Sequence, residues 1–243
     1  MVPSKLWQVP KMWEGEDVWI IGGGPSIIDS FGIPTDLVKA VRLREKEIEA
    51  YSPYFAAIHA KHVIGINVAY KFGNWVDICF FGDKSFFLNH QAGLSHFKKL
   101  VVTCSSYIGQ KNLGWVKYLS HETKRNVTKG QQGYGISTNA RQVCWNKNSG
   151  AAAISVAAWL GVKRIILVGF DMTISPVNNE QHFHNEYRQF GMKLKTAKLP
   201  FKVHLQPWGV IKSDADNMGI ELLNTSLNSA IKEIPKVHMK ELL

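Results

Sequence analysis

Residues 18–26 read Val-Trp-Ile-Ile-Gly-Gly-Gly-Pro-Ser, so that an apolar run ends abruptly in a glycine-rich turn. Three further apolar runs end in the same way, immediately before Asn67, before Gly82-Asp83 and before Gly169-Phe170-Asp171. Apolar runs of this length, without alternation, are typical of strands that are buried on both faces of a parallel sheet. Ligands of such sheets bind beyond the carboxyl ends of the strands. We therefore expect these polar strand ends to converge on one pocket.

Predicted helices alternate with the strands, which indicates an α/β, Rossmann-like fold: a mostly parallel sheet with helices on both faces. The length favours one domain over residues 1–243, beginning with an irregular arm at 1–16. Residues 121–147 are polar and rich in Gly, Gln and Asn. A loop of this length is unusual and predicts a lid or binding loop. Helices are also expected to extend from Thr35 to about Ala50 and over 226–234.

Composition argues against several classes of protein. No window approaches the ~18 uninterrupted apolar residues of a membrane-spanning helix. The N-terminus has no apolar signal region, so we expect a cytoplasmic protein. Three cysteines, at positions 79, 104 and 144, lie far apart in the sequence. This spacing argues against both a disulfide framework and a zinc site.

The net charge of +10 is concentrated in two blocks. Residues 111–150 contain seven basic side chains and one acidic, and residues 188–212 contain six basic and none acidic. Basic blocks favour anionic partners such as nucleotides, nucleic acid or acidic sugars, although a solvated surface explains them equally well. No zinc-finger, helix-turn-helix or RNA-recognition motif is present, so sequence-specific reading of nucleic acid is not predicted.

The glycine-rich turn lies between a predicted strand and a predicted helix, where backbone N–H groups and the helix dipole favour a phosphate. It matches neither G-x-G-x-x-G nor G-x-x-x-x-G-K-[ST], so the two commonest nucleotide motifs are absent. A plain tight turn is the alternative. We favour contact with a nucleotide or phosphate through the turn residues Gly22, Gly23, Gly24, Pro25 and Ser26.

A second candidate contact lies at Asn148-Ser149-Gly150. Ser149 is expected to cap the helix that follows, and Gly150 leaves the start of that helix bare, so that a ligand can touch the backbone. The alternative is an ordinary helix cap with small residues for tight packing against the sheet.

Three polar residues at strand ends complete the predicted binding set. Asp83 and Asp171 can accept hydrogen bonds from ribose hydroxyls, hold a metal ion, or cap the next helix, of which capping is the commonest. Asn67 can bind the edge of a base or sugar, or cap its own helix.

His182-Phe183-His184 lies in the loop after the Gly-Phe-Asp strand end. A histidine with a pKa near neutrality is a suitable general base for deprotonating a sugar hydroxyl. Two histidines separated by one residue point in opposite directions in an extended chain, so a shared metal ion is not expected. A polar surface role is the alternative for both.

In their order, these motifs resemble glycosyltransferase family 42, the sialyltransferases. They also resemble a wider group of bacterial and phage proteins and the archaeal 6-hydroxymethylpterin pyrophosphokinase-like family. The resemblance extends from about Asp17 to Asn228 and includes Gly-Phe-Asp-Met at 169–172, followed by His-Phe-His. It implies a Rossmann-like transferase with a cytidine monophosphate donor held by Gly23, Gly24, Pro25, Ser26, Asn67, Ser149 and Gly150.

The resemblance further implies a catalytic histidine in the loop after the Gly-x-Asp strand end, with His184 as first choice and His182 as second. The family's Asn-Ser near the last strand resembles Asn228-Ser229 or Asn224-Thr225-Ser226. This chain departs from the family turn Gly-Asn-Gly-Pro-Ser by having Gly23 at the asparagine position. The departure removes a side chain expected to contact the donor.

The leading hypothesis is a glycosyltransferase that uses a nucleotide-activated sugar, requires no metal, and acts on a glycan or modified-DNA acceptor. The first alternative is a pyrophosphokinase-like enzyme using ATP and Mg²⁺, with Asp83 and Asp171 as metal ligands. The second alternative is a non-enzymatic module that binds nucleotides or nucleic acid.

Overall fold

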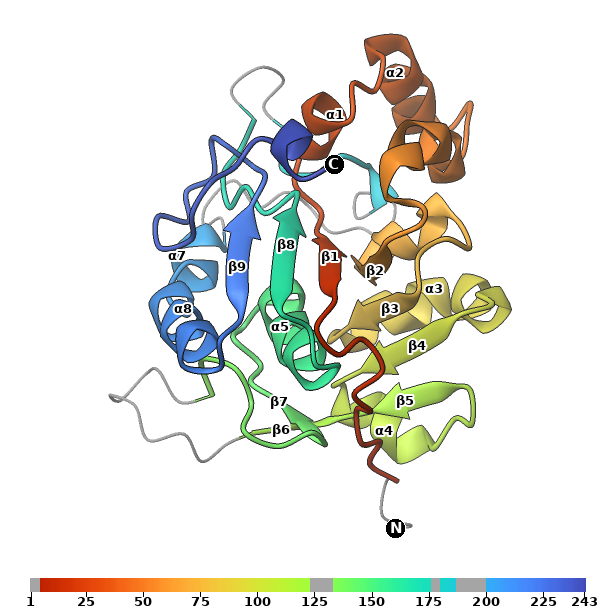
Figure 1. The fold of residues 1–243 in the computed structure, drawn as a ribbon. Coiled ribbons are helices and arrows are strands. Elements are labelled where there is room, and N and C mark those ends of the chain that lie inside the picture. The colour runs from red at the N-terminus through yellow and green to blue at the C-terminus, as the bar shows by residue number, and fades with distance from the viewer. Residues whose placement is uncertain (1–4, 123–132, 176–179, 187–199) are drawn as a thin grey trace.

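A computed structural model describes residues 5–122, 133–175, 180–186 and 200–243 (Figure 1). Seven parallel strands form one sheet in the order β5-β4-β3-β2-β1-β8-β9, which confirms the predicted α/β, Rossmann-like class. The strands are β1 (Asp17–Ile21), β2 (His62–Ile66), β3 (Ile78–Phe81), β4 (Leu100–Thr103), β5 (Val116–Tyr118), β8 (Arg164–Val168) and β9 (Glu221–Asn224). The strand order reverses between β1 and β8, which is where ligands bind in open α/β sheets.

The central strands are apolar throughout because each faces two cores. Along β1, Val18 and Ile20 belong to one buried cluster, whereas Trp19 and Ile21 belong to the other. Successive side chains of a strand point to opposite faces, so a strand covered on both faces needs apolar residues at every position. Burial of the central strands on both faces of the sheet therefore explains the unbroken apolar runs in the sequence.

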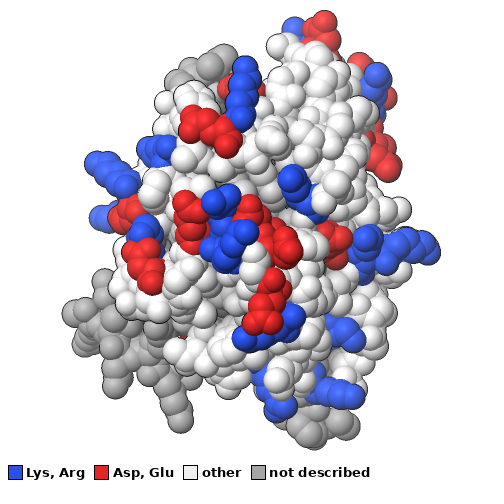
Figure 2. Space-filling view, in the orientation of Figure 1, with Lys and Arg blue, Asp and Glu red and all other residues white. Residues whose placement is uncertain are grey.

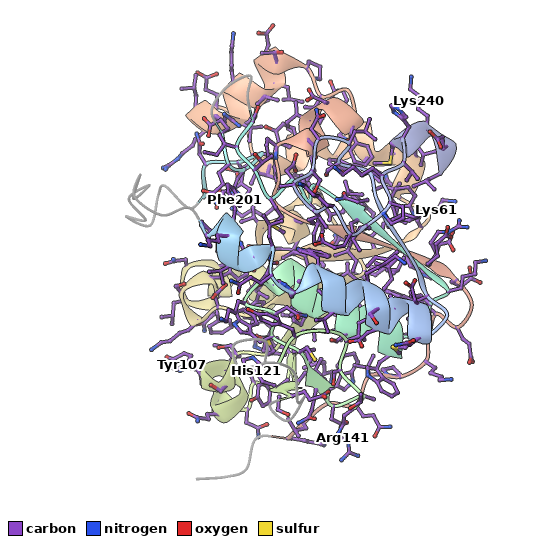
Figure 3. All side chains as sticks on the ribbon, turned by 90° about the vertical axis from the view of Figure 1, so that its left-hand side faces the viewer. Lys61, Tyr107, His121, Arg141, Phe201 and Lys240 are labelled. Carbon is purple, nitrogen blue, oxygen red and sulfur yellow. The ribbon has the colours of Figure 1, made fainter. Side chains whose placement is uncertain are left out.

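Helices cover both faces of the sheet, as predicted. One face carries α5 (Ser149–Trp159), α8 (Trp208–Asn217) and the short α7 (Phe201–His204), which lie together in Figure 3. Every residue of α5 from its first serine to Ala158 is buried, which explains its apolar composition on all sides. The other face carries α1 (Ser26–Ser30), α2 (Thr35–Leu43), η1 (Ile48–Ile58), η2 (Asn67–Phe72), α3 (Lys84–His96), α4 (Ser106–Lys111) and η3 (Met239–Glu241).

Two predicted helices differ from the structure. The first ends at Leu43, because Arg44 adopts a left-handed conformation with φ 66°, and a separate 3₁₀ helix follows in η1. Residues 226–234 form turns and bends instead of a helix. There the hydroxyl of Ser229 donates to the carbonyl oxygen of Phe170 at 2.6 Å, and the Phe170 N–H donates to Ser226 Oγ at 3.1 Å. Short polar side chains used in this way compete with helix formation.

The predicted lid over 121–147 lies partly outside the described residues, because 123–132 are not included. A two-stranded sheet, β6 (Ser120–His121) and β7 (Gln142–Val143), frames the segment. Asn146 anchors the described part: its side chain accepts from Gly135 N at 2.8 Å and donates to Gly135 O at 2.9 Å and Cys144 O at 3.1 Å. Ser137 joins this part to α5, because its N–H donates to Ser155 Oγ at 3.0 Å and its carbonyl oxygen accepts from Trp159 Nε1 at 2.9 Å. A binding role for the segment stays a prediction.

Candidate active site

The glycine-rich turn after β1 packs directly on the turn after β8. Gly22 N donates to Val168 O, and Gly24 N donates to Gly169 O, both at 2.8 Å. A Cβ atom on Gly24 would lie 1.7 Å from Asp171 Oδ2 and 2.6 Å from Gly169 O. Only glycine therefore fits at position 24, and the triple glycine reflects close contact between two strand ends as well as any approach of a ligand.

Phe170 joins this turn to the start of α5. A Cβ atom on Gly22 would lie 3.1 Å from the Phe170 ring, and one on Gly150 would lie 2.8 Å from the same ring. The two glycine-containing segments, far apart in the sequence, thus contact one aromatic side chain. Their backbones meet at the carboxyl end of the sheet, beside the β1–β8 reversal of strand order.

The His-Phe-His segment lies over the same turn. His182 Nδ1 is 3.1 Å from the position that a Cβ on Gly23 would occupy, and the Phe183 N–H donates to Gly23 O at 3.1 Å. The rings of His182 and His184 stack, with centroids 5.4 Å apart and planes 13° apart. The imidazole of His182 therefore occupies the space beside Gly23.

Burial disfavours the charged form of both histidines. Burial lowers the pKa of His182 to about 4, an effect that a hydrogen bond with the Gly23 backbone partly opposes. Burial lowers the pKa of His184 well below its usual 6.5, and the neighbouring side chains of His182, His90, Lys71 and Arg42 lower it further. His184 is 4% exposed, and its Nδ1 accepts the Glu186 N–H at 3.2 Å. In a neutral imidazole this places the ring proton of His184 on Nε2.

Both carboxylate oxygens of Asp171 accept hydrogen bonds from Ser26. Its Oδ1 accepts the Ser26 N–H at 3.2 Å and its Oδ2 accepts the Ser26 hydroxyl at 2.9 Å, while the hydroxyls of Ser26 and Ser226 lie 2.8 Å apart. Burial raises the pKa of Asp171 to about 6, against the opposing effect of Ser26. Because Ser26 is the first residue of α1, these contacts indicate that Asp171 holds the first turn of this helix.

Asn148, and not Ser149, caps α5, which corrects the sequence prediction. Its Oδ1 accepts the Ala151 N–H at 3.1 Å. The buried Ser149 hydroxyl makes no hydrogen bond at 3.5 Å or less with the described residues, although it lies near enough to Asp83 to lower the pKa of that carboxyl. Partial burial of Asp83 has the larger effect and raises this pKa. Asn67 follows β2 with a left-handed backbone, φ 51°, and begins η2.

The two aspartates proposed as Mg²⁺ ligands do not share a site. Asp83 follows β3 and Asp171 follows β8, and the sheet order places β2 and β1 between them. Three strand spacings correspond to about 14 Å, whereas Mg²⁺ binds its ligands at roughly 2.1 Å. Among the residues that the structure describes, no group of three or more His, Cys, Asp or Glu side chains could hold a metal ion. The separation of Asp83 from Asp171 argues against these two residues as ligands of one Mg²⁺ ion.

The surface seen in Figure 2 carries lysine and arginine side chains interspersed with acidic ones, so this face shows no continuous basic stripe. A cleft of about 280 Å³ between η1, η2 and α3 includes Tyr70 and Lys71 in its lining, but none of the predicted site residues. Within the described ranges, no helix is long and apolar enough to span a bilayer.

Sequence reasoning did not identify several residues that build this region. Arg42 lies in a charged stretch of the sequence, yet its side chain is 14% exposed and paired with Glu180. Lys71 pairs with Glu186 at 2.8 Å. Such ion pairs join residues far apart in the chain, so no local pattern reports them. Phe170 was noticed only as part of the Gly-Phe-Asp motif.

Comparisons with known proteins find solved structures with a similar fold but no related sequence. No family model matches this chain, and no curated protein sequence matches it. The Maf glycosyltransferase from Magnetospirillum magneticum AMB-1 has a similar structure, with a TM-score of 0.57 and 12% identity over 98% of this chain. This chain spans 36% of the length of that protein.

Two structures of a sialyltransferase are also similar. A variant of Cst-II in complex with CMP has a TM-score of 0.50 and 13% identity, covering 92% of this chain and 86% of that one. CstII from Campylobacter jejuni with CMP has a TM-score of 0.46 and 14% identity, covering 93% and 86%. At these identities the likeness concerns the fold alone, and the roles of individual residues stay predictions.

Proposed function

We propose that this protein is a glycosyltransferase that binds a nucleotide-activated sugar at the carboxyl end of β1. The observation that carries the proposal is the meeting of three segments: Gly22 and Gly150 contact the same Phe170 ring, and His182 lies against Gly23. Backbone N–H groups at a helix start can stabilise a departing phosphate. Because the N–H groups of Gly22, Gly24 and Ser26 already bond within the protein, this role is proposed for the start of α5. The fold shared with solved glycosyltransferases supports the same class.

Of the two histidines, His182 is better arranged to act as the general base. Its Nδ1 is the ring atom nearest to Gly23, so Nε2 is directed away from the turn. His184 is more deeply buried, and with its Nδ1 engaged by the Glu186 N–H, its Nε2 carries a proton. A base must accept the proton of the acceptor hydroxyl, which an Nε2 atom that already carries a proton cannot do. We therefore assign proton transfer to His182 and support of the ring above it to His184.

The donor nucleotide is proposed to be cytidine monophosphate, as the family resemblance implies and as CMP binding by Cst-II supports. The family's asparagine is replaced by Gly23, and the imidazole of His182 fills the adjoining space. An asparagine at position 23 would meet this ring, so the two positions are coupled. The acceptor is proposed to be a glycan or modified DNA.

The test is donor hydrolysis with CMP-, UDP- and GDP-activated sugars, each with and without EDTA. We expect hydrolysis of the CMP-activated sialic acid that persists in EDTA. His182→Ala is expected to lower turnover by about 10²–10⁴-fold, and His184→Ala to lower it less. His96→Ala, which removes an exposed histidine at the end of α3, serves as the matched control. Full turnover in His182→Ala would reject the assigned base, and failure with every donor would reject the proposed class.

A further inference from the structure

Arg42, in the last turn of α2, contacts residues 180–186, the described segment that contains His-Phe-His, at three points. Its Nη1 pairs with Glu180 Oε1 at 2.7 Å, and its Nη2 donates to the carbonyl oxygen of His182 at 3.1 Å. Its own carbonyl oxygen accepts from Asn185 Nδ2 at 3.0 Å. The side chains of Arg42 and Glu180 are 14% and 16% exposed, so this ion pair is largely shielded from solvent.

The other end of the segment is held by η2. Lys71 Nζ lies 2.8 Å from Glu186 Oε2, and the Phe183 ring stacks on Phe72 with centroids 5.0 Å apart. Between these two attachments, the Phe183 N–H donates to Gly23 O, which fixes the segment to the glycine-rich turn. Arg42 differs from Lys71 because it binds the backbone of the histidine that lies over that turn.

We propose that Arg42 is a positioning residue that holds His182 against Gly23, an inference that rests on the proposed function. The guanidinium presents several N–H donors in a rigid plane and stays charged at every accessible pH, so it can bind the Glu180 carboxylate and the His182 carbonyl together. A lysine is a single point charge and cannot reproduce both contacts. Arg42 itself touches no reacting group; it acts through the direction of the His182 imidazole.

The experiment compares Arg42→Gln and Arg42→Lys with the wild type by amide hydrogen exchange and by ¹⁵N NMR of histidine side chains. Arg164→Gln is the matched control, because Arg164 is likewise held in ion pairs, with Asp17 and Glu221, but lies at the amino end of β8. Exchange of the Phe183 amide reports whether the segment stays bound to Gly23. Turnover is measured with a CMP-activated sialic acid.

In Arg42→Gln we expect Phe183 exchange to be faster by about tenfold or more, together with a changed His182 ring signal. Exchange in β1 and β8 is expected to stay at the wild-type rate. The turnover number is expected to fall about 10–100-fold with little change in KM, and Arg42→Lys to recover it in part. Arg164→Gln is expected to change neither Phe183 exchange, nor the His182 ring signal, nor turnover.

Unchanged Phe183 exchange in Arg42→Gln would overturn the inference. A uniform rise across Phe183 and the strands β1 and β8 would also overturn it, because that result indicates a general loss of stability. If Arg42→Gln does not fold, Glu180→Gln removes the same ion pair while the arginine remains. Failure of the proposed function is recognised separately: the wild type would then turn over none of the activated sugars, whereas the exchange of Phe183 needs no substrate.

Discussion

Gly24→Ala tests the packing of the two strand ends most directly. The added Cβ would lie 1.7 Å from Asp171 Oδ2 and 2.6 Å from Gly169 O, which belongs to the backbone. Relief requires the carboxylate to leave Ser26 and the two turns to separate. Overpacking costs about 1–3 kcal/mol, and loss of hydrogen bonds to a buried charged group costs about 1–3 kcal/mol more. The reduced entropy of the unfolded chain returns only about 0.4–1 kcal/mol.

The expected net loss of stability in Gly24→Ala is about 3 kcal/mol, or roughly 6–12 °C in Tm for a chain of this size. The assay is urea unfolding at pH 7.5 followed by tryptophan fluorescence, with thermal unfolding as the second measure. Two other glycines provide the comparison. Gly23→Ala meets only His182 Nδ1 at 3.1 Å, and Gly209→Ala in α8 meets nothing within 4 Å.

We expect Gly23→Ala to stay within about 1 kcal/mol of the wild type, because an imidazole can shift by a few tenths of an ångström. Gly209→Ala is expected to be neutral or more stable by about 0.5 kcal/mol. The reasoning is refuted if Gly24→Ala unfolds at the same urea concentration as Gly23→Ala. That result would mean that the turns after β1 and β8 are not in the contact described.

Asp171→Asn tests the raised pKa of that carboxyl. Its folded-state pKa of about 6 lies above the ordinary 3.8, so its protonation stabilises the fold at low pH, and the contribution of about 3 kcal/mol is lost as pH rises from about 4 to 6. The buried histidines, whose pKa values are lowered, make the protein more stable as pH rises through this window, which is the opposite effect. The wild type is therefore compared with the variant: the difference in their unfolding free energies is measured at pH 4 and at pH 7. An equal difference at both pH values would contradict the prediction. If His182, with a pKa of about 4, is the base, kcat/KM for donor hydrolysis should persist at pH 5 and decline only below about pH 4.5; an acidic limb near 6.5 would exclude it. Asn148→Ala should destabilise the protein by about 1 kcal/mol through loss of the α5 cap, as measured by urea unfolding. Ser149→Ala should leave stability nearly unchanged but raise KM for the donor, as measured by steady-state kinetics.

The central strands could be predicted closely from sequence because the cause of their pattern is local. The run Ile78–Phe81 is the strand β3 itself, and the run before the triple glycine ends β1 at Ile21. A residue that is buried on both faces of a sheet must be apolar regardless of which strand lies beside it. The predicted helix over 226–234 failed for the opposite reason, since Ser226 and Ser229 bond to Phe170.

The candidate site could be predicted in part. The glycine-rich turn and the start of α5 were identified because glycines at strand and helix ends are visible in the sequence. The cap of α5 was placed on Ser149 instead of Asn148, because both residue types favour that position and only the backbone conformation separates them. The burial of Arg42 and its bond to His182 had no local signal.

By itself, the sequence determined that this protein is an α/β protein with a parallel sheet buried on both faces, because burial imposes its pattern on each segment separately. Only the tertiary structure decided that the strand order reverses between β1 and β8, that Phe170 joins Gly22 to Gly150, and that His182 fills the space beside Gly23. These are contacts between residues far apart in the chain. Each depends on the shape of its partner, which no single segment encodes.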